Sequence, residues 1–459
     1  MIARKPVFLP AFLPVSLGLA LAFAAVPASA LDLVQSYRLA LQQDAHYLAS
    51  RAEADAGREA VPQARAQLLP NISGNLARGK NYTDQEGKNS FGQTVTSSYE
   101  YLSSNYVVSL RQPLYRKYNF ALYEQAQAQV EGAEATLDKS LQEMLVRLSS
   151  AYFEALMAQD QHALVLAQKE AYAGQLAAAK RLFAAGQGTR TDIDDAQARY
   201  DMTLAQELEA SQNLGYTRRQ LQTIVNQPVD DLALLDPARM QLQAPLPASA
   251  EEWITRGEEV NPELRAMRAN IEAARQELEK ARAGHFPTVD LVAQRSKSAS
   301  ENNITVNSQY LTSQVGLQVT IPLFAGGYAS SQVRQATANI EKFEQQYEAR
   351  RREVALQIRK EFQSVAEGVL KVRAQEQAER SADQAVFSNQ KGFQAGTRSQ
   401  IDILNAQQQR MNVKRDLAQV RYQYILARLR LQSLVSSLNE QEIEAVNAWL
   451  TVRPVGSAG

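Results

Sequence analysis

The residues of this chain that could do chemistry at a defined spacing are aspartates that follow a glycine and a hydroxyl residue. Residues 186–192 and 396–402 both begin with glycine, carry Thr or Ser three positions later, and end in Asp after three more positions. Glycine can adopt the left-handed conformation that ends a helix, and Ser or Thr three residues before an acid is typical of the start of the next helix. The pattern predicts two acidic helix-to-helix turns, with Gly186 and Gly396 as the turn residues.

Other kinds of chemistry find no support in the sequence. Cysteine is absent, which excludes disulfides, a thiol nucleophile and cysteine-ligated zinc. The three histidines, His46, His162 and His285, lie too far apart in sequence to give a metal-ligand spacing. No Ser/His/Asp set and no glycine-rich phosphate loop appear. We therefore expect no enzyme activity, no cofactor and no metal site.

The charge balance argues against a nucleic-acid partner, and the N-terminal residues indicate an exported chain. Lys plus Arg and Asp plus Glu number 49 each, so bulk positive charge for a nucleic-acid partner is missing. Residues 1–30 begin with two basic residues, continue with an apolar run, and end in Ala28-Ser29-Ala30, which predicts a signal peptide. An N-terminal membrane anchor is the alternative reading. No later run is long and apolar enough for a membrane helix, so any insertion must use strands.

The turns that carry the aspartates belong to an internal repeat. The segments FAAGQGTRTDIDDAQ (183–197) and FQAGTRSQIDILNAQ (393–407) share seven of fifteen residues. We predict two copies of one unit, residues 31–240 and 251–450, joined by a linker over 241–250 and followed by a tail over 451–459.

Each copy is predicted to contain a helix, two strands, a very long helix and a further helix. Proline is absent from both long-helix regions, and the apolar positions step by three and four residues, as in a coiled-coil seam. Each long helix would be a rod of roughly 100 Å. The predicted ranges are strands 69–82 and 99–113 with helices 118–185 and 189–226, then strands 286–298 and 309–323 with helices 328–395 and 399–437.

The predicted strands alternate between apolar and polar residues, most clearly in residues 310–321. Aromatic residues gather where the strands end, as in a membrane-interface belt: Tyr115, Tyr118, Phe324 and Tyr328. From alternation alone, a sheet packed on soluble partners is an equal alternative. Four strands of one chain cannot close in hydrocarbon, so a membrane barrel would have to be shared by several chains.

The order of these features is similar to that of the TolC family of outer-membrane efflux and secretion ducts. The likeness rests on the duplicated plan, the segments QPLY (112–115) and IPLFAGG (321–327), and the turn AGTRSQIDILNAQQQ (395–409). It implies a mostly α fold with a small β part, in which a homotrimer forms a 12-stranded outer-membrane barrel continued by a long α-helical coiled-coil barrel in the Gram-negative periplasm.

The resemblance also implies partners. Such ducts dock on a periplasmic adaptor protein and an inner-membrane transporter of the ABC, RND or MFS class, contact outer-membrane lipid, and passively conduct drugs or secreted proteins. A secreted trimeric coiled-coil adhesin is the alternative function, although it should place its strands at one chain end. A periplasmic hydrolase is the weakest candidate.

Carried over residue by residue, the resemblance gives the acidic turns a role in closing the tunnel. Asp402 matches the family's constriction-ring aspartate, and Arg398, Thr191 and Asp192 match residues of the network that holds the tip closed. Relatives have a tyrosine at the position of Phe393.

A second ring aspartate is expected where this chain has Asn405, whereas the first repeat has Asp195 at the corresponding position. We therefore expect an acidic constriction in which some of the carboxylates have moved to the neighbouring helices.

Overall fold

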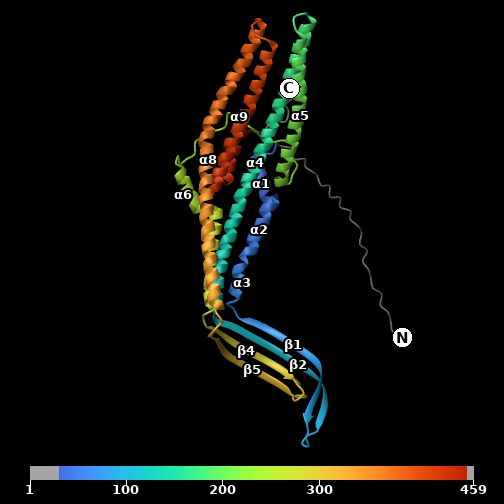
Figure 1. Cartoon of the computed structure of the whole chain (residues 1–459), viewed down its shortest axis with the longest axis vertical. Coiled ribbons are helices and arrows are strands. Elements are labelled where there is room, and N and C mark those ends of the chain that lie inside the picture. The colour runs from blue at the N-terminus through green and yellow to red at the C-terminus, as the bar shows by residue number, and fades with distance from the viewer. Residues whose placement is uncertain (1–29, 452–459) are drawn as a thin grey trace, which may run out of the picture.

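The computed structural model describes residues 30–451 and shows a long rod of helices above a curved sheet (Figure 1). The predicted signal peptide, residues 1–30, lies outside the described residues except for Ala30, and the predicted tail, residues 451–459, does so except for Thr451. Thr451, which the sequence placed in the tail, belongs to a short strand.

The elements follow one another in two similar series. The first is α1 (Leu33–Gln43), α2 (Ala45–Arg58), α3 (Ala60–Ala66), β1 (Asn71–Lys88), β2 (Thr94–Tyr115), α4 (Lys117–Ala184), α5 (Arg190–Val225) and β3 (Leu234–Leu235). The second is α6 (Ala250–Val260), α7 (Pro262–Ala283), β4 (Thr288–Ala299), β5 (Gln309–Thr320), α8 (Tyr328–Gln394), α9 (Gln400–Leu434), α10 (Glu440–Asn447) and β6 (Leu450–Thr451).

The four long strands form one antiparallel sheet in the order β1-β2-β4-β5. The register sets Ser73 opposite Ser109, and the two hydroxyl oxygens lie 2.8 Å apart. The opposite face of the sheet carries an apolar band whose members are exposed, except for the half-buried Leu110 and Leu291: Ile72, Leu76, Val108, Leu110, Leu291, Val315, Leu317 and Val319. One face is therefore polar and the other apolar, although both are exposed in the single chain.

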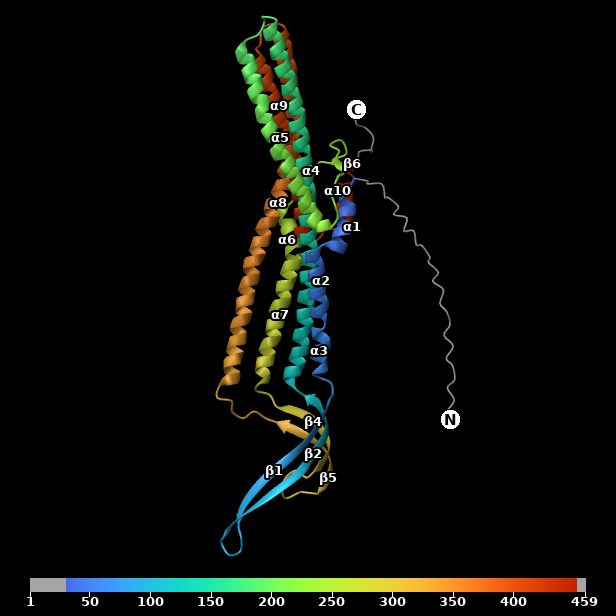
Figure 2. The ribbon, with the colours of Figure 1, turned by 90° about the vertical axis from the view of Figure 1, so that its right-hand side faces the viewer.

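The first hairpin is longer than the sequence predicted. β1 continues to Lys88 and β2 begins at Thr94, beyond the predicted limits at 82 and 99. The segment TDQEGK lacks apolar alternation and suggested a loop, but backbone pairing continues through it as far as Lys88 and Thr94. This hairpin extends past β4 and β5 (Figure 2). Backbone pairing, together with polar contacts such as those of Ser98 with Asp84 and of Asn303 with Gln85, thus maintains a strand that the pattern could not reveal.

The helices form a layer in which α4 and α8 run the full length of the rod. α5 packs on α4 and α9 packs on α8, while α4 and α9 join the two hairpins (Figure 2). Near the sheet, α7 lies between α4 and α8, and α2 and α3 lie along α4. None of the helices in residues 30–451 has both the length and the apolar character needed to cross a membrane.

Each helix that the sequence predicted before a strand pair is divided in the structure. Asp44 ends α1 and caps α2, where its carboxylate accepts a hydrogen bond from the Tyr47 amide. Asn261 ends α6 and caps α7 in the same way. A side chain that caps a new helix start competes with continuous helix, so Asp44 explains the break between α1 and α2, and Asn261 explains the break between α6 and α7.

The apolar core lies at the middle of the rod, where elements from both chain ends meet. β3 pairs with β6, and α10 packs on α1. Trp253 and Trp449 are buried there beside α8 and α9 side chains. The sequence did not predict α10 or the small sheet, because segments of two to eight residues carry too little periodicity.

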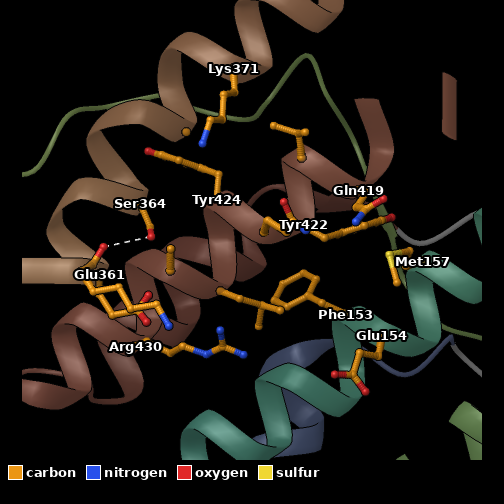
Figure 3. A pocket seen from close by; sticks show the side chains of 16 residues that line it. Phe153, Glu154, Met157, Glu361, Ser364, Lys371, Gln419, Tyr422, Tyr424 and Arg430 are labelled. Atoms are coloured by element: carbon orange, nitrogen blue, oxygen red, sulfur yellow. Dashed lines mark hydrogen bonds between the residues drawn. The ribbon is translucent and has the colours of Figure 1, made fainter. Parts of the chain in front are cut away.

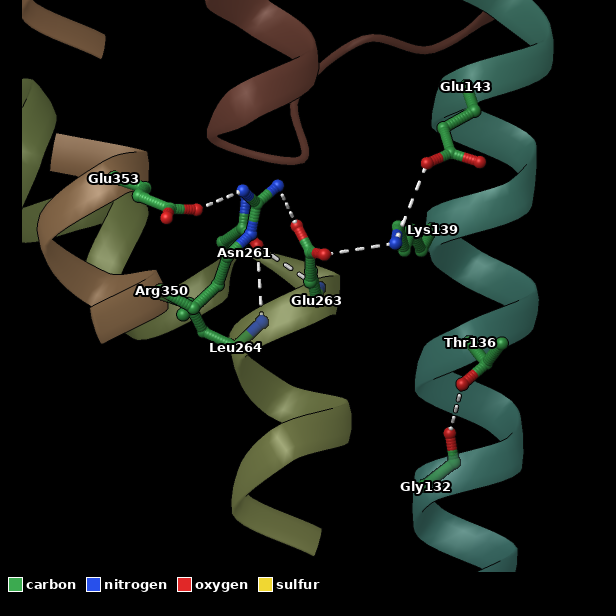
Figure 4. Close-up of polar contacts among 9 residues, drawn as sticks. All are labelled: Gly132, Thr136, Lys139, Glu143, Asn261, Glu263, Leu264, Arg350 and Glu353. Carbon is green, nitrogen blue, oxygen red and sulfur yellow. Dashed lines mark hydrogen bonds and ion pairs between the residues drawn. The ribbon is translucent and has the colours of Figure 1, made fainter. Parts of the chain in front are cut away.

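A charged cluster joins three helices near the start of α7. Arg350 of α8 donates to Glu263 of α7 at 2.6 Å, and Glu263 also accepts from Lys139 of α4 at 3.0 Å (Figure 4). Burial raises the pKa of Glu263, but the hydrogen bonds from Arg350 and Lys139 outweigh it, so that the pKa lies below its ordinary value. Arg351 likewise pairs with Glu258 of α6, whereas Arg352 pairs with Glu348 of its own helix.

Candidate functional site at the helical tips

The glycines predicted to end the long helices do so. Gly186 has φ +72° and Gly396 has φ +77°, both in the left-handed region that L side chains rarely adopt. The amide of Gln187 donates to the carbonyl of Leu182, and the amide of Thr397 donates to that of Gly392, each at 2.9 Å. This is the Schellman arrangement, so the two tips reverse the chain by the same backbone device.

The hydroxyl and acid of each turn form a complete capping box. Asp192 accepts from the Thr189 amide at 3.0 Å, and Asp402 accepts from the Ser399 amide at 2.9 Å. In return the Thr189 and Ser399 hydroxyl oxygens accept from the aspartate amides. Each carboxylate is therefore fixed at the N-terminus of its helix, where the helix dipole favours negative charge.

The local hydrogen bonds also keep Asp402 ionised. Hydrogen bonds from the backbone amide and the hydroxyl of Ser399, together with the nearby Arg398 charge, lower the pKa of Asp402 against a small opposing effect of burial. The carboxylate thus remains negatively charged at neutral pH.

The three predicted latch residues lie at the tips, but the single chain does not join them into a network. Arg398 folds over the last turn of α8, and its Cγ lies 2.7 Å from where a β-carbon of Gly392 would stand. Thr191 is exposed, and within residues 30–451 its side chain makes no hydrogen bond. Phe393 and Asp192 line one small cavity of about 170 Å³ between the hairpins, which a phenylalanine cannot bridge by a hydrogen bond.

The structure reveals a direct contact between the hairpins that the sequence did not suggest. Arg199 of α5 donates from Nη2 to the Oδ1 atom of Asn405 in α9 at 2.7 Å. Asp195, one turn before Arg199, has no ion pair or side-chain hydrogen bond within the described part of the chain. Asn405 therefore acts as a hydrogen-bond acceptor for the other hairpin.

Further along the rod, glutamines join the same helices. Gln168 of α4 donates to Gln408 of α9 at 2.9 Å, and the Tyr172 hydroxyl donates to the same oxygen at 2.8 Å. Gln175 and Gln400 form another such pair. Polar residues at seam positions were the available sequence signal, because they interrupt the apolar repeat.

The four predicted belt aromatics lie at the junction between sheet and helices. All are exposed, and the most exposed is Phe324 at 91%. The Tyr118 ring lies under the ammonium of Lys280, 5.3 Å from it, and the Tyr328 hydroxyl accepts from Gln332. Exposed aromatic side chains at the junction of strands and helices suit a water–lipid boundary.

A groove of about 430 Å³ is present halfway along the rod (Figure 3). It lies between α4, α8 and α9 and is lined by charged residues of both signs, including Glu361, Lys371 and Arg430. Burial raises the pKa of Glu361. Histidine and cysteine are absent from its lining, and Ser364 only donates to its own helix. The groove offers no nucleophile and base at catalytic spacing.

Comparison with known proteins identifies the architecture. A family model described as outer membrane efflux protein matches residues 36–227 and 253–437. Two solved channels have the same fold. The outer-membrane channel OprN has a TM-score of 0.75 and 17% identity over 89% of this chain and 90% of that one, and VceC of Vibrio cholerae has 0.74 and 18% over 89% and 97%.

Curated relatives are similar along almost the whole chain. The proteases secretion protein PrtF of Dickeya chrysanthemi is 34% identical, covering 98% of this chain and 96% of its own. The alkaline protease secretion protein AprF of Pseudomonas aeruginosa is 36% identical over 92% and 88%. The outer membrane protein TolC of Escherichia coli is 30% identical over 97% and 90%.

These findings confirm the predicted TolC-type fold, location and partner classes. Proteins of this kind are Gram-negative outer-membrane channels with a periplasmic tunnel, and they work as trimers with periplasmic adaptors and inner-membrane transporters rather than as enzymes. The adhesin alternative is not supported, since the strands lie between helices in both halves. The chain belongs to the outer membrane efflux protein family of channels.

Proposed function

We propose that three copies of this chain close into one channel that exports proteins of the protease class, with the acidic helical tips as its entrance. The observation that carries the proposal is that both layers of the single chain have free edges. β1 and β5 each have one unpaired edge, and α5 and α8 lie at the two ends of the helix order α5-α4-α9-α8. Unpaired strand edges are not tolerated in lipid, so further copies must supply the missing neighbours.

Three copies fit the dimensions of an open passage. Each contributes four strands, giving twelve, whereas the interior of an eight-stranded barrel is nearly filled by its own side chains. The polar face, with Ser73, Ser109 and Gln294, would line the interior, and the apolar band would face lipid. The two repeats would thus provide equivalent halves of each subunit, over residues 31–240 and 251–450.

The cargo class rests on the relatives. Two proteins named for the secretion of proteases, PrtF and AprF, are 34% and 36% identical to this chain. A solvent efflux pump outer membrane protein, SrpC of Pseudomonas putida, is 27% identical over 48% of the chain, which favours small-molecule efflux as the second candidate.

A complementation experiment separates the two cargo classes. The chain would be expressed in cells that lack their own channel but retain a protease exporter with its adaptor and, separately, a drug pump. Our proposal expects protease activity to return to the medium. Restored drug resistance without secreted protease would replace protein cargo by small-molecule cargo.

At the entrance, Asp402, Asp192, Asp195 and Asn405 would form the constriction, and Arg398 with Thr191 and Phe393 would contribute to holding it closed. Arg398 has no ion pair within the described residues, so its hydrogen-bond partner would come from a neighbouring copy. A charge-assisted hydrogen bond contributes about 1.5–3 kcal/mol, and less where water reaches it. Arg398→Ser should therefore raise single-channel conductance in planar bilayers, whereas Arg190→Ser, on the exposed face of α5, should not. A variant at position 398 as tightly closed as the wild type would remove this residue from the gate.

A further inference from the structure

Four basic residues stand on the apolar face of the sheet, near the end that lies away from the helices. They are Arg78 and Lys80 of β1 and Arg295 and Lys297 of β4. The period of two puts the first pair on the face of Ile72 and Leu76, and the second pair on the face of Val289 and Leu291. All four residues are exposed.

The register places the two pairs at similar heights above the helices. Lys297 is opposite Tyr106, which is opposite Leu76. Strands in a membrane barrel tilt by roughly 35–45°. The residue at the same height on the next strand is therefore not the register partner but lies about one to one and a half positions away from it. β1 starts opposite Arg111, although β2 continues four residues further toward the helices, to Tyr115. On β1, the residue at a given height therefore has a higher number than the register partner. From β4 to β1 there are two such steps, so the residue of β1 at the height of Lys297 is about Arg78 rather than the register partner Leu76.

The basic residues at this level mostly lack acidic partners, unlike those at the helix end of the sheet. At the helix end, Arg116 donates to Asp290 at 2.8 Å, and Lys117 pairs with Glu279 at 2.7 Å. At the far end Lys80 pairs with Glu100, but Arg78, Arg295 and Lys297 have no acidic partner within residues 30–451.

Acidic residues near the hairpin tip do not neutralise this group of charges. Asp84 and Glu86 lie further along β1, where the strand has passed the ends of β4 and β5. The basic girdle, defined as Arg78, Arg295 and Lys297, thus leaves three unpaired positive charges per chain above a band of exposed apolar residues.

We infer that the basic girdle binds the phosphate groups of a glycolipid in the outer leaflet of the membrane. The inference rests on the proposed membrane barrel, because only that placement brings lipid headgroups to this level. Arginine forks match phosphate geometry, and long basic side chains can lie along apolar surface with the charge at the headgroups. The apolar band directly below indicates a lipid rather than a free anion, since acyl chains would cover it while the headgroup meets the charges.

Binding can be measured on the purified trimer by native mass spectrometry with two probes, bisphosphorylated lipid A and the same lipid with both phosphates removed. We expect the phosphorylated form to bind more tightly. The triple variant Arg78→Gln/Arg295→Gln/Lys297→Gln should lose this affinity by on the order of tenfold or more, because each basic side chain at a charged membrane surface contributes roughly fivefold.

The control changes the same residue types elsewhere. Arg334, Lys342 and Arg373 are exposed on α8, and their triple change to Gln should leave lipid binding intact. Arg78→Lys/Arg295→Lys keeps the charge and should retain most of the affinity, which guards against a girdle variant that assembles poorly.

Three results would overturn the inference: equal binding of both lipids, unchanged affinity of the girdle variant, or an equal loss in the α8 control. Inorganic phosphate that binds the girdle equally well without lipid would likewise contradict it. Conductance of the same preparations separates the two proposals, since a trimer that conducts normally but ignores lipid phosphate refutes only the girdle.

Discussion

The two helical tips use one turn design in different surroundings. Both end a long helix on a left-handed glycine and start the next with a capping box. At the second tip, however, Ile403 and Leu404 are buried within the first two turns of α9, whereas Ala196 is the one buried residue in the first three turns of α5. The turn is therefore set locally, and the difference lies in how many neighbours each following helix has.

This difference indicates where a further copy of the chain would pack in the proposed trimer. α9 packs on both α8 and α4, while α5 packs mainly on α4. On α5, Leu204 and Leu208 are exposed and lie one turn apart. On α8, Leu356 and Leu370 are exposed and lie two heptads apart. Apolar residues at helical spacing on two outer helices suit a seam between copies.

The largest expected effect comes from placing a charge on this seam. Leu208 is 63% exposed in the single chain, and Leu208→Glu would bury an unpaired carboxylate between copies. Such burial costs several kcal/mol, so we expect loss of the trimer in unheated SDS gels and in light scattering. Gln206→Glu adds the same charge on the exposed face of α5 that borders the groove toward α9, and this control should assemble normally. If Leu208→Glu trimers persist, the seam lies elsewhere.

Replacing the turn glycines tests whether the tips are equivalent. A β-carbon in the left-handed region costs roughly 1–2 kcal/mol, so Gly186→Ala and Gly396→Ala should lower thermal stability by similar amounts. Gly396→Ala should also change conductance more strongly than Gly186→Ala, because Arg398 lies two residues after Gly396. Asparagine tolerates this conformation, so Gly396→Asn should have the weaker effect. Equal conductance changes at both glycines would contradict the distinction between the tips.

The charge at the second tip predicts a pH response. The pKa of Asp402 lies below its ordinary value, so its favourable contribution is complete above about pH 4 and is lost as the pH falls through the lowered value. We expect cation preference in reversal-potential measurements to persist from pH 7 to about pH 4 and to weaken below that. Asp402→Asn should reduce the preference throughout this range, whereas Asp201→Asn, which lies on α5 further from the tip, should not. A preference that falls already between pH 7 and 5 would assign it to other groups.

Local patterns predicted the fold well, and contacts between elements were harder to predict. The long helices and the turns at Gly186 and Gly396 follow from proline placement, periodicity and capping spacing, which neighbouring residues determine. Arg199 and Asn405 are 206 residues apart in the sequence, so their contact depends on how the two helical hairpins lie side by side. Sequence resemblance instead suggested Arg398 and Phe393, and neither side chain forms a hydrogen bond to the other hairpin within residues 30–451.

The contact between Arg199 and Asn405 gives the smallest expected effect and the closest test of how the two hairpins are joined. Asn405→Asp would turn the 2.7 Å hydrogen bond into an ion pair. Both side chains are accessible to water, so the gain should be about 0.2–1 kcal/mol. We expect a slightly lower conductance that returns to the wild-type value at high salt, because salt screens an exposed pair. Asn405→Ala, which removes the acceptor, should raise conductance slightly and without salt dependence. If both variants shift conductance in the same direction, the added charge or the lost volume at the entrance governs the current rather than the bond between the hairpins.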